Sequence, residues 1–122
     1  MENFIHKELT YKIIGAAYEV YNALGSGFLE KVYENAMLIE LESVGLKVQQ
    51  QAPIKVTYNG KTIGEYFADL LVEEKVIVEL KSVTELTSIH EVQLVNYLRA
   101  TGMRVGLLIN FGDKIKVKRK VL

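Results

Sequence analysis

Glu79 is an acidic residue inside a strongly apolar segment, Val76-Ile77-Val78-Glu79-Leu80-Lys81. A run this apolar predicts a strand that is covered on both faces, so we expect Glu79 to be at least partly buried. A buried carboxylate is costly unless a cation, a hydrogen-bond donor or a proton neutralises it. Lys81 follows two residues later, and alternate residues of a strand share one face. The spacing therefore places Glu79 and Lys81 side by side.

A second carboxylate, Asp69, is expected directly opposite Glu79. The polar residues 73–75 indicate a short turn between two strands. If Val72 pairs with Val76 across this turn, the side chains of Asp69 and Glu79 face each other, with Cβ atoms about 4.5–5.5 Å apart. Two facing carboxylates repel each other unless a cation lies between them. Their oxygen atoms suit Mg²⁺ or Mn²⁺, which are the cofactors that we expect here.

Lys81 would give this cluster a catalytic group. Its ammonium could orient a water nucleophile or stabilise negative charge that develops on a phosphoryl oxygen. The simpler interpretation is an ordinary cross-strand charge cluster on a solvated face. A two-residue turn would also place Leu80 opposite Asp69 and break the cluster. The spacing alone leaves these alternatives open.

The elements that must position these residues follow from hydrophobic spacing and turn signals. In the second helix we expect Leu29, Val32, Ala36 and Ile39 to face the core. A capping box at 88–91 is expected to open the third helix. The predicted order is two helices, three strands, a helix and two strands. The helices are expected over residues 5–24, 28–44 and 88–101. The strands are expected over residues 47–58 (interrupted at Pro53), 62–72, 76–83, 104–110 and 114–121. This order predicts a single mixed α/β domain over residues 1–122, with helices packed on a central sheet.

Composition narrows the class of protein. The chain has 122 residues, with 15 Lys+Arg balanced by 15 Asp+Glu, so its net charge does not indicate a nucleic-acid partner. The absence of cysteine excludes a disulfide framework and any thiolate metal site. No apolar stretch approaches the ~20 residues that cross a bilayer, and residues 1–15 lack the apolar core of a signal peptide. We therefore expect a cytoplasmic protein with no membrane partner.

Two helical motifs add to the cluster. Glu30, Tyr33, Glu34 and Met37 share one helix face, and Gln93 and Tyr97 lie four residues apart on a later helix. The pattern Gly27-x-x-Glu30-x-x-Tyr33 resembles the signature of the GxxExxY proteins, a bacterial and archaeal family within the PD-(D/E)XK nuclease superfamily. Further matching segments are Phe67-Ala68-Asp69, Val78-Glu79-Leu80-Lys81, residues 93–102 and residues 106–112.

This resemblance implies a restriction-endonuclease-like αβββαβ core, here with an extra N-terminal helix and a C-terminal basic strand. It implies that Asp69 and Glu79 bind the metal, that Lys81 is the catalytic lysine, and that Glu30 is a further acidic ligand. It also implies that Tyr33, Gln93 and Tyr97 support the site or contact the substrate. Ala68 stands at the position of the proline in the superfamily's name.

We therefore expect a Mg²⁺- or Mn²⁺-dependent phosphodiester hydrolase that acts on DNA in preference to RNA. The alternative is a nucleic-acid-binding or regulatory module that keeps the fold and has little or no catalytic activity. Lys116, Lys118 and Arg119 of the C-terminal strand are candidate phosphate contacts. Lysines on an edge strand also discourage aggregation, and the two roles are compatible. A homodimer would enlarge the substrate surface, but no feature of the sequence fixes the oligomeric state.

Overall fold

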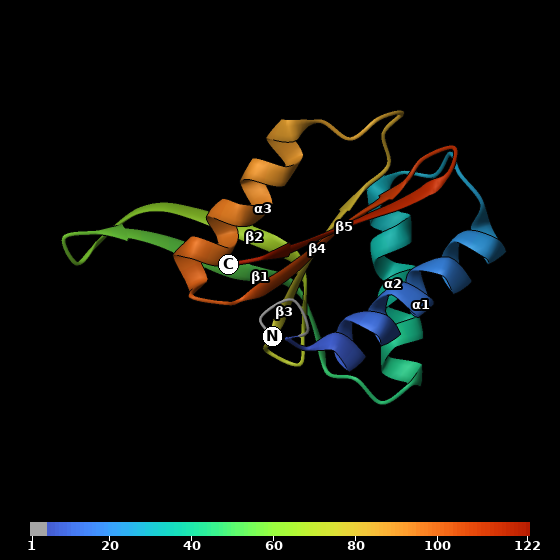
Figure 1. The fold of residues 1–122 in the computed structure, drawn as a ribbon, viewed down its shortest axis with the longest axis horizontal. Helices are drawn as coiled ribbons and strands as arrows, with labels where there is room; N and C mark the ends of the chain where they lie inside the picture. The colour runs from blue at the N-terminus through green and yellow to red at the C-terminus, as the bar shows by residue number, and fades with distance from the viewer. Residues whose placement is uncertain (1–4) are drawn as a thin grey trace.

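The computed structural model describes residues 5–122 and contains three helices and five strands in that part of the chain (Figure 1). The expected domain is therefore described from residue 5 onward, and residues 1–4 lie outside the described residues. The order of elements agrees with the prediction. The bounds are α1 Lys7–Leu24, α2 Glu30–Ser43, β1 Val48–Tyr58, β2 Lys61–Val72, β3 Val76–Lys81, α3 Ser88–Thr101, β4 Val105–Phe111 and β5 Ile115–Val121.

The five strands form one mixed sheet in the order β1-β2-β3-β4-β5. β3 and β4 are parallel, and the other neighbouring strands are antiparallel. Only the parallel pair needs a crossover connection, which α3 provides. Val72 pairs with Val76 across the turn, so the register expected for β2 and β3 is confirmed.

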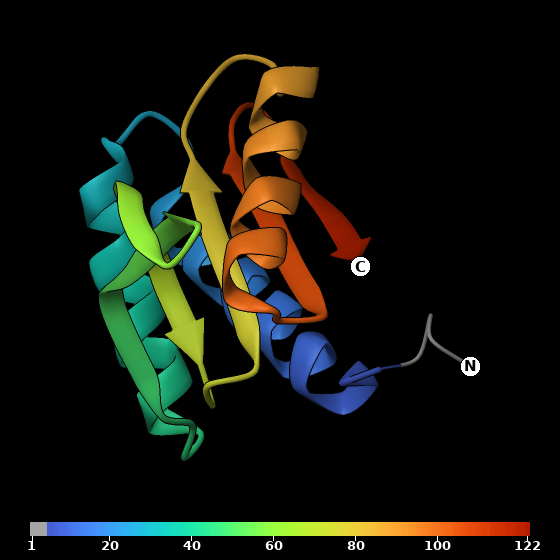
Figure 2. The same cartoon turned by 90° about the vertical axis from the view of Figure 1, so that its left-hand side faces the viewer.

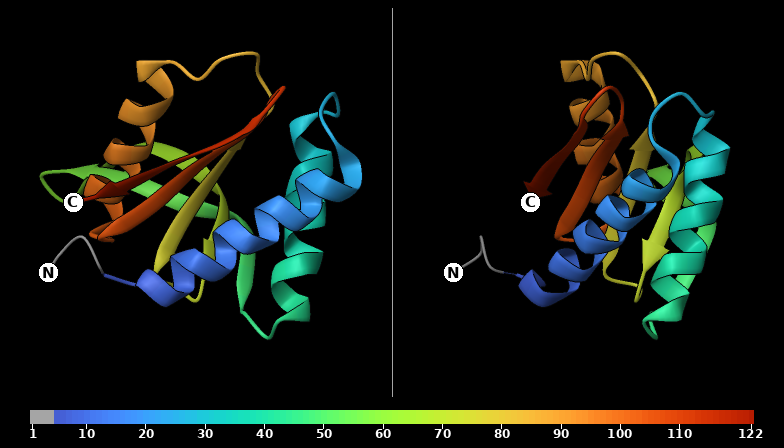
Figure 3. Two further views of the ribbon diagram at one scale, coloured as in Figure 1. Left: turned by 45° about the vertical axis from the view of Figure 1, so that its right-hand side comes forward. Right: turned by 90° about the vertical axis from the view of Figure 1, so that its right-hand side faces the viewer.

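Helices cover both faces of the sheet, which gives three layers. α1 and α2 lie on one face and α3 lies on the other, as the opposite views in Figure 2 and Figure 3 show. The cluster under α1 and α2 contains Ile13, Val20, Met37 and Leu107, whereas Leu108 belongs to the cluster under α3. Leu107 and Leu108 are neighbours in β4, so successive side chains of that strand fill opposite cores.

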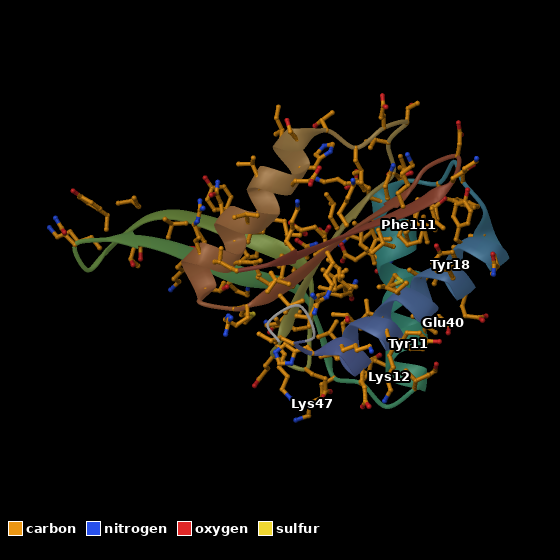
Figure 4. All side chains as sticks on the ribbon, in the orientation of Figure 1. Tyr11, Lys12, Tyr18, Glu40, Lys47 and Phe111 are labelled. Atoms are coloured by element: carbon orange, nitrogen blue, oxygen red, sulfur yellow. The ribbon has the colours of Figure 1, made fainter. Side chains whose placement is uncertain are left out.

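The core-facing side of α2 differs from the expectation. Leu29 is 81% exposed and Ile39 is 69% exposed, while Tyr33, Met37 and Leu41 are completely buried. Both stripes have helical spacing, so periodicity alone could not choose between them. The ring of Tyr33 decides the rotation of the helix because it stacks on Phe111 with a centroid distance of 4.3 Å. Figure 4 shows Phe111 beside α2.

The β1–β2 hairpin differs from the expectation in one respect, because β1 runs unbroken through Pro53. Proline lacks a backbone N–H, which an edge strand tolerates. The predicted turn at Asn59-Gly60 is present, with positive φ at both residues. The pairing also shifts beside Gly64, between Val56 and Thr57. The hairpin extends beyond the rest of the sheet alongside the C-terminal half of α3 (Figure 1).

The N-cap of α3 lies one residue earlier than predicted. Thr87, not Ser88, is the N-cap residue, and its backbone N–H donates to Nδ1 of His90 at 3.2 Å. His90 therefore takes the place that the prediction gave to Glu91. The helix approaches β4 closely at Gly106, where an added Cβ would lie 2.7 Å from Leu94. No helix in residues 5–122 is both long and apolar enough to span a membrane.

Candidate functional site

Asp69 and Glu79 face each other where β2 and β3 separate. The regular pairing of these strands ends at Leu70 and Val78. Beyond that point each carboxylate takes the place of a backbone acceptor. The N–H of Asp69 donates to Oε2 of Glu79 at 2.9 Å, and the N–H of Leu80 donates to Oδ2 of Asp69 at 2.8 Å. The two strands are thus held apart by a pair of carboxylates, as the predicted register required.

Glu79 is the more buried member of this pair. Its side chain is buried, whereas Asp69 is half-buried. Burial, together with the negative charge of Asp69, raises the pKa of Glu79 to about 8. Without a bound cation Glu79 therefore holds a proton at neutral pH. A divalent cation between the two carboxylates would take over the neutralising role of that proton.

Lys81 is half-buried and lies on the same face of β3 as Glu79. The loop that follows it is fixed by Asn110, a buried residue of β4. The side chain of Asn110 accepts from the N–H of Val83 at 3.0 Å and donates to its carbonyl oxygen at 2.9 Å. Gly112 leaves room for this loop, because a Cβ there would lie 2.7 Å from the Val83 carbonyl oxygen. The backbone beyond Lys81 is therefore firmly positioned.

Gln51 connects the pair to α2. It lies opposite Asp69 in β1 and has a left-handed backbone with φ of 50°. Consecutive strand residues normally point to opposite faces, but this irregularity lets both Gln50 and Gln51 donate to Glu34, each at 2.8 Å. The amide nitrogen of Gln51 also lies 3.4 Å from Oδ1 of Asp69. Gln51 thus bridges a buried carboxylate of α2 and the carboxylate of β2.

The acidic residue of α2 that reaches this network is Glu34, not Glu30. Glu30 is exposed in the first turn of the helix, whereas Glu34 is buried and also pairs with Lys31 at 2.9 Å. Within residues 5–122 no three carboxylate or imidazole groups gather closely enough to hold a metal ion. The structure therefore does not bring Glu30 together with Asp69 and Glu79 as a third ligand. The signal that could have identified the network is the polar run at 49–51, which interrupts the alternation of β1.

Tyr97 and Gln93 lie close to the carboxylates on the α3 side. The amide of Gln93 donates to the hydroxyl oxygen of Tyr97 at 3.0 Å. The pKa of Tyr97 is raised to about 12, mainly because the ring is desolvated and also because Glu79 and Asp69 are negatively charged. The hydroxyl of Tyr97 therefore remains protonated at neutral pH and can donate a hydrogen bond. The structure thus brings Tyr97, with its partner Gln93, to the α3 side of the carboxylate pair.

Tyr33 lies in the core under α1 and α2 rather than beside the carboxylates. Its hydroxyl donates to the carbonyl oxygen of Gly25 at 2.6 Å and accepts from the N–H of Phe28 at 3.3 Å. Because the side chain is completely buried, it has no surface to offer a substrate. Its contacts instead fix the loop that leads into α2. Any support for the site would act through the position of that helix.

The three basic residues predicted as phosphate contacts do not share a face. Lys116 and Lys118 are exposed and alternate with Arg119 along β5. Lys120 has the same parity as the two lysines and pairs with Glu91 of α3, which places Lys116 and Lys118 on the α3 side. Arg119 points to the other face, where its guanidinium donates to the carbonyl oxygen of Ile5. The structure thus brings the lysines, but not Arg119, to the face that carries Glu79.

Comparisons with known proteins identify the superfamily. Residues 7–121 match a family model described as the PD-(D/E)XK nuclease superfamily. A search of curated proteins finds no match. Among solved structures, the crystal structure of SSO0001 is similar, with a TM-score of 0.59, 17% identity and coverage of 98% of this chain. This chain spans only 61% of that protein's length, and the likeness concerns the fold alone. The alkaline exonuclease LHK-Exo from Laribacter hongkongensis matches with a TM-score of 0.48 and 15% identity, covering 75% of this chain and 55% of its own.

Proposed function

Because the chain belongs to the PD-(D/E)XK nuclease superfamily, we propose that it is a divalent-metal-dependent phosphodiester hydrolase that acts on nucleic acid, with DNA as the preferred substrate. One observation carries this proposal. Asp69 and Glu79 face each other between two strands, and Lys81 lies on the same face two residues from Glu79. An ordinary surface charge cluster would not bury one carboxylate and hold both with backbone donors.

The carboxylate pair fits Mg²⁺ or Mn²⁺. Both ions prefer oxygen ligands and need only one or two carboxylates, because water and substrate phosphate complete their coordination. The backbone donors use Oε2 of Glu79 and Oδ2 of Asp69, and the amide nitrogen of Gln51 lies 3.4 Å from Oδ1 of Asp69. Each carboxylate oxygen has two lone pairs, so both carboxylates keep the capacity to bind a cation. When bound, the ion would polarise the scissile phosphate and neutralise its negative charge.

Lys81 and Tyr97 supply the remaining chemistry from the chain itself. The ammonium of Lys81 would hold the attacking water and stabilise the negative charge that builds up on a phosphoryl oxygen. Tyr97 would act as a neutral donor, because its hydroxyl keeps its proton at neutral pH. Gln93 already donates to the Tyr97 oxygen, which leaves the Tyr97 proton for another acceptor. Gln93 thereby orients Tyr97 toward the reacting group.

Within the superfamily we place the chain among the GxxExxY proteins, on the pattern Gly27-x-x-Glu30-x-x-Tyr33. The second candidate function is a nucleic-acid-binding module with the same fold and little or no turnover. One observation favours it, namely that only two acidic side chains gather at the site in the described part of the chain. The exposed Lys116 and Lys118 would serve either function as phosphate contacts.

The test is a cleavage assay at low salt on single- and double-stranded DNA and RNA, with Mg²⁺, Mn²⁺ or EDTA. We expect metal-dependent cleavage that falls roughly 100- to 1,000-fold in Lys81→Ala, the usual cost of losing one charge-stabilising donor. Lys75→Ala is the matched control, because Lys75 is exposed in the turn at the opposite end of β3. Cleavage that survives unchanged in Lys81→Ala would overturn the assignment of Lys81.

Measurements of metal binding and nucleic-acid binding test the proposed metal site and separate the hydrolase from the binding module. Calorimetry with Mn²⁺ should show weaker binding to Asp69→Asn and nearly unchanged binding to Lys81→Ala, since only the first variant loses a ligand charge. Equal Mn²⁺ affinity in wild type and Asp69→Asn would contradict the proposed site. Binding of nucleic acid without any metal-dependent cleavage would support the binding module instead.

A further inference from the structure

A groove of about 690 Å³ separates α3 from the β1–β2 hairpin. Tyr66 of β2 and Tyr97 of α3 both line it and contact each other, with ring centroids 5.8 Å apart. Gln93, Asn96 and Arg99 line its α3 wall. The volume is within the range of pockets that enclose a small molecule or a group of similar size.

The groove adjoins the carboxylate pair. Tyr97 lines the groove and also lies close enough to Glu79 and Asp69 to experience their negative charges. Tyr66 precedes Asp69 by three residues in β2, which corresponds to about 10 Å along a strand. A nucleotide held in the groove would therefore lie near the phosphate that reaches the carboxylates.

The lining has the chemistry of a site for an unpaired base. Tyr66 is 49% exposed, so one part of its ring is free to stack while the rest packs in the groove. Gln93 and Asn96 carry amides that can donate to and accept from base edges. Arg99 adds an exposed cation for phosphate, and no acidic side chain is among the lining residues. Aromatic stacking with basic support is the usual means of holding single strands.

A duplex fits these features less well. Its bases are stacked on one another and paired, so they cannot stack on Tyr66 without leaving the helix. Recognition of duplex backbone would instead require several cations along the surface, whereas this groove contains one, Arg99.

We propose that the groove between α3 and the β1–β2 hairpin binds single-stranded nucleic acid next to the carboxylate pair, with Tyr66 stacking on a base. This inference rests on the proposed function, because it identifies the substrate class of the same site. Tyr66 acts as a specificity-determining residue for unpaired strands. Arg99 contributes to the affinity through phosphate, and this contribution decreases as the salt concentration rises.

Tryptophan fluorescence provides a direct test, because the chain has no tryptophan. Tyr66→Trp keeps an aromatic ring in the groove and reports stacking as quenching when oligothymidylate is added in EDTA. Tyr58→Trp is the matched control, since Tyr58 is exposed on the same hairpin but does not line the groove. We expect quenching at position 66 and none at position 58. Equal quenching at both positions, or none at position 66, would overturn the inference.

Affinity measurements in EDTA complete the test. Tyr66→Ala should weaken binding of labelled oligothymidylate roughly 5- to 150-fold, the equivalent of the 1–3 kcal/mol typical of one stacked base. Tyr66→Phe should bind like wild type, which also shows that the hairpin is intact. A duplex of equal length should bind more weakly than the single strand and should not respond to Tyr66→Ala.

These outcomes distinguish the groove from the proposed hydrolase. Single-strand binding that depends on Tyr66 without cleavage in Mn²⁺ would support the groove and overturn the hydrolase. Metal-dependent cleavage with single-strand affinity unchanged in Tyr66→Ala would overturn the groove alone. An absence of nucleic-acid binding in wild type would overturn both.

Discussion

The two faces of the sheet differ in what they contain. The face under α1 and α2 is a continuous apolar core that ends in the stacked pair Tyr33 and Phe111. The face under α3 has a smaller apolar cluster, and beside it lie the carboxylate pair and the groove. The difference indicates that one layer supplies most of the stability, while the other carries the facing carboxylates and the open surface that chemistry requires.

The buried side chains of β1 and β2 change from one face of the sheet to the other beside the carboxylate pair. Leu70 and Val72 of β2 belong to the core under α1 and α2, whereas Ala68 belongs to the cluster under α3. These residues have the same parity, so the change requires an irregularity, and it falls at Asp69. β1 changes face at Gln51, which lies opposite Asp69. The carboxylate pair therefore occupies the point where regular pairing would otherwise continue.

The difference between the two layers should have its largest effect at Leu107 and Leu108. These adjacent residues of β4 are completely buried and face opposite layers. Either leucine-to-alanine change should lower the free energy of unfolding by about 2–5 kcal/mol, measured by urea denaturation. Leu107→Ala should keep full activity per folded molecule. Leu108→Ala should also lower activity, because Leu108 packs in the cluster that contains Tyr97. Equal activity in the two variants would contradict the division of tasks.

The buried charge on the α3 side should make stability depend on pH. The pKa of Glu79 is about 8 in the folded protein against an ordinary value of 4.5. Between these values the folded state holds a proton that the unfolded state releases, so stability falls as pH rises, by at most about 1.4 kcal/mol per pH unit. Urea denaturation in EDTA between about pH 5 and about pH 8 should show this decline.

Glu79→Gln should flatten that decline, because glutamine does not titrate. Glu74→Gln is the matched control, since Glu74 is exposed in the turn before β3. Mn²⁺ should stabilise the wild-type protein more as pH rises, because it binds the deprotonated carboxylates. If Glu79→Gln and wild type lose stability in parallel, Glu79 is not the group responsible.

The smallest changes in stability and activity are expected at Gln51. Two variants can separate the strain of its left-handed backbone from its role in positioning Asp69. A left-handed backbone costs roughly 1–2 kcal/mol for a residue other than glycine, so Gln51→Gly should be about 1 kcal/mol more stable than Gln51→Ala. Both variants lose the bridge between Glu34 and Asp69 and should lose activity roughly tenfold, as is typical of groups that orient a metal ligand. Thermal denaturation and Mn²⁺ titration would measure the two effects. Mn²⁺ affinity equal to that of wild type in both variants would show that Gln51 does not position Asp69.

Local patterns predicted the parts of the site that depend on neighbours in sequence. The turn at 73–75 and the alternation of β3 predicted Asp69 opposite Glu79 with Lys81 on the same face, and the observed pairing of Val72 with Val76 excluded the alternative two-residue turn. The order of helices and strands followed from periodicity and turn residues in the same way. The face of α2 was predicted wrongly, because Tyr33 and Ile39 both lie on apolar stripes and only the stacking partner Phe111 distinguishes them.

The fold class, the register of β2 with β3 and the carboxylate pair were predicted correctly from the sequence, because the turn and the strand patterns behind them involve residues close together in the chain. Tertiary packing was needed to show which acidic residue of α2 is connected to Asp69 through Gln51, on which side Arg119 lies, and that the hairpin and α3 enclose a groove. Those outcomes depend on contacts between segments far apart in the chain, such as Gln51 with Glu34 and Tyr66 with Tyr97. No local pattern encodes such distances, because they result from how the layers pack on one another.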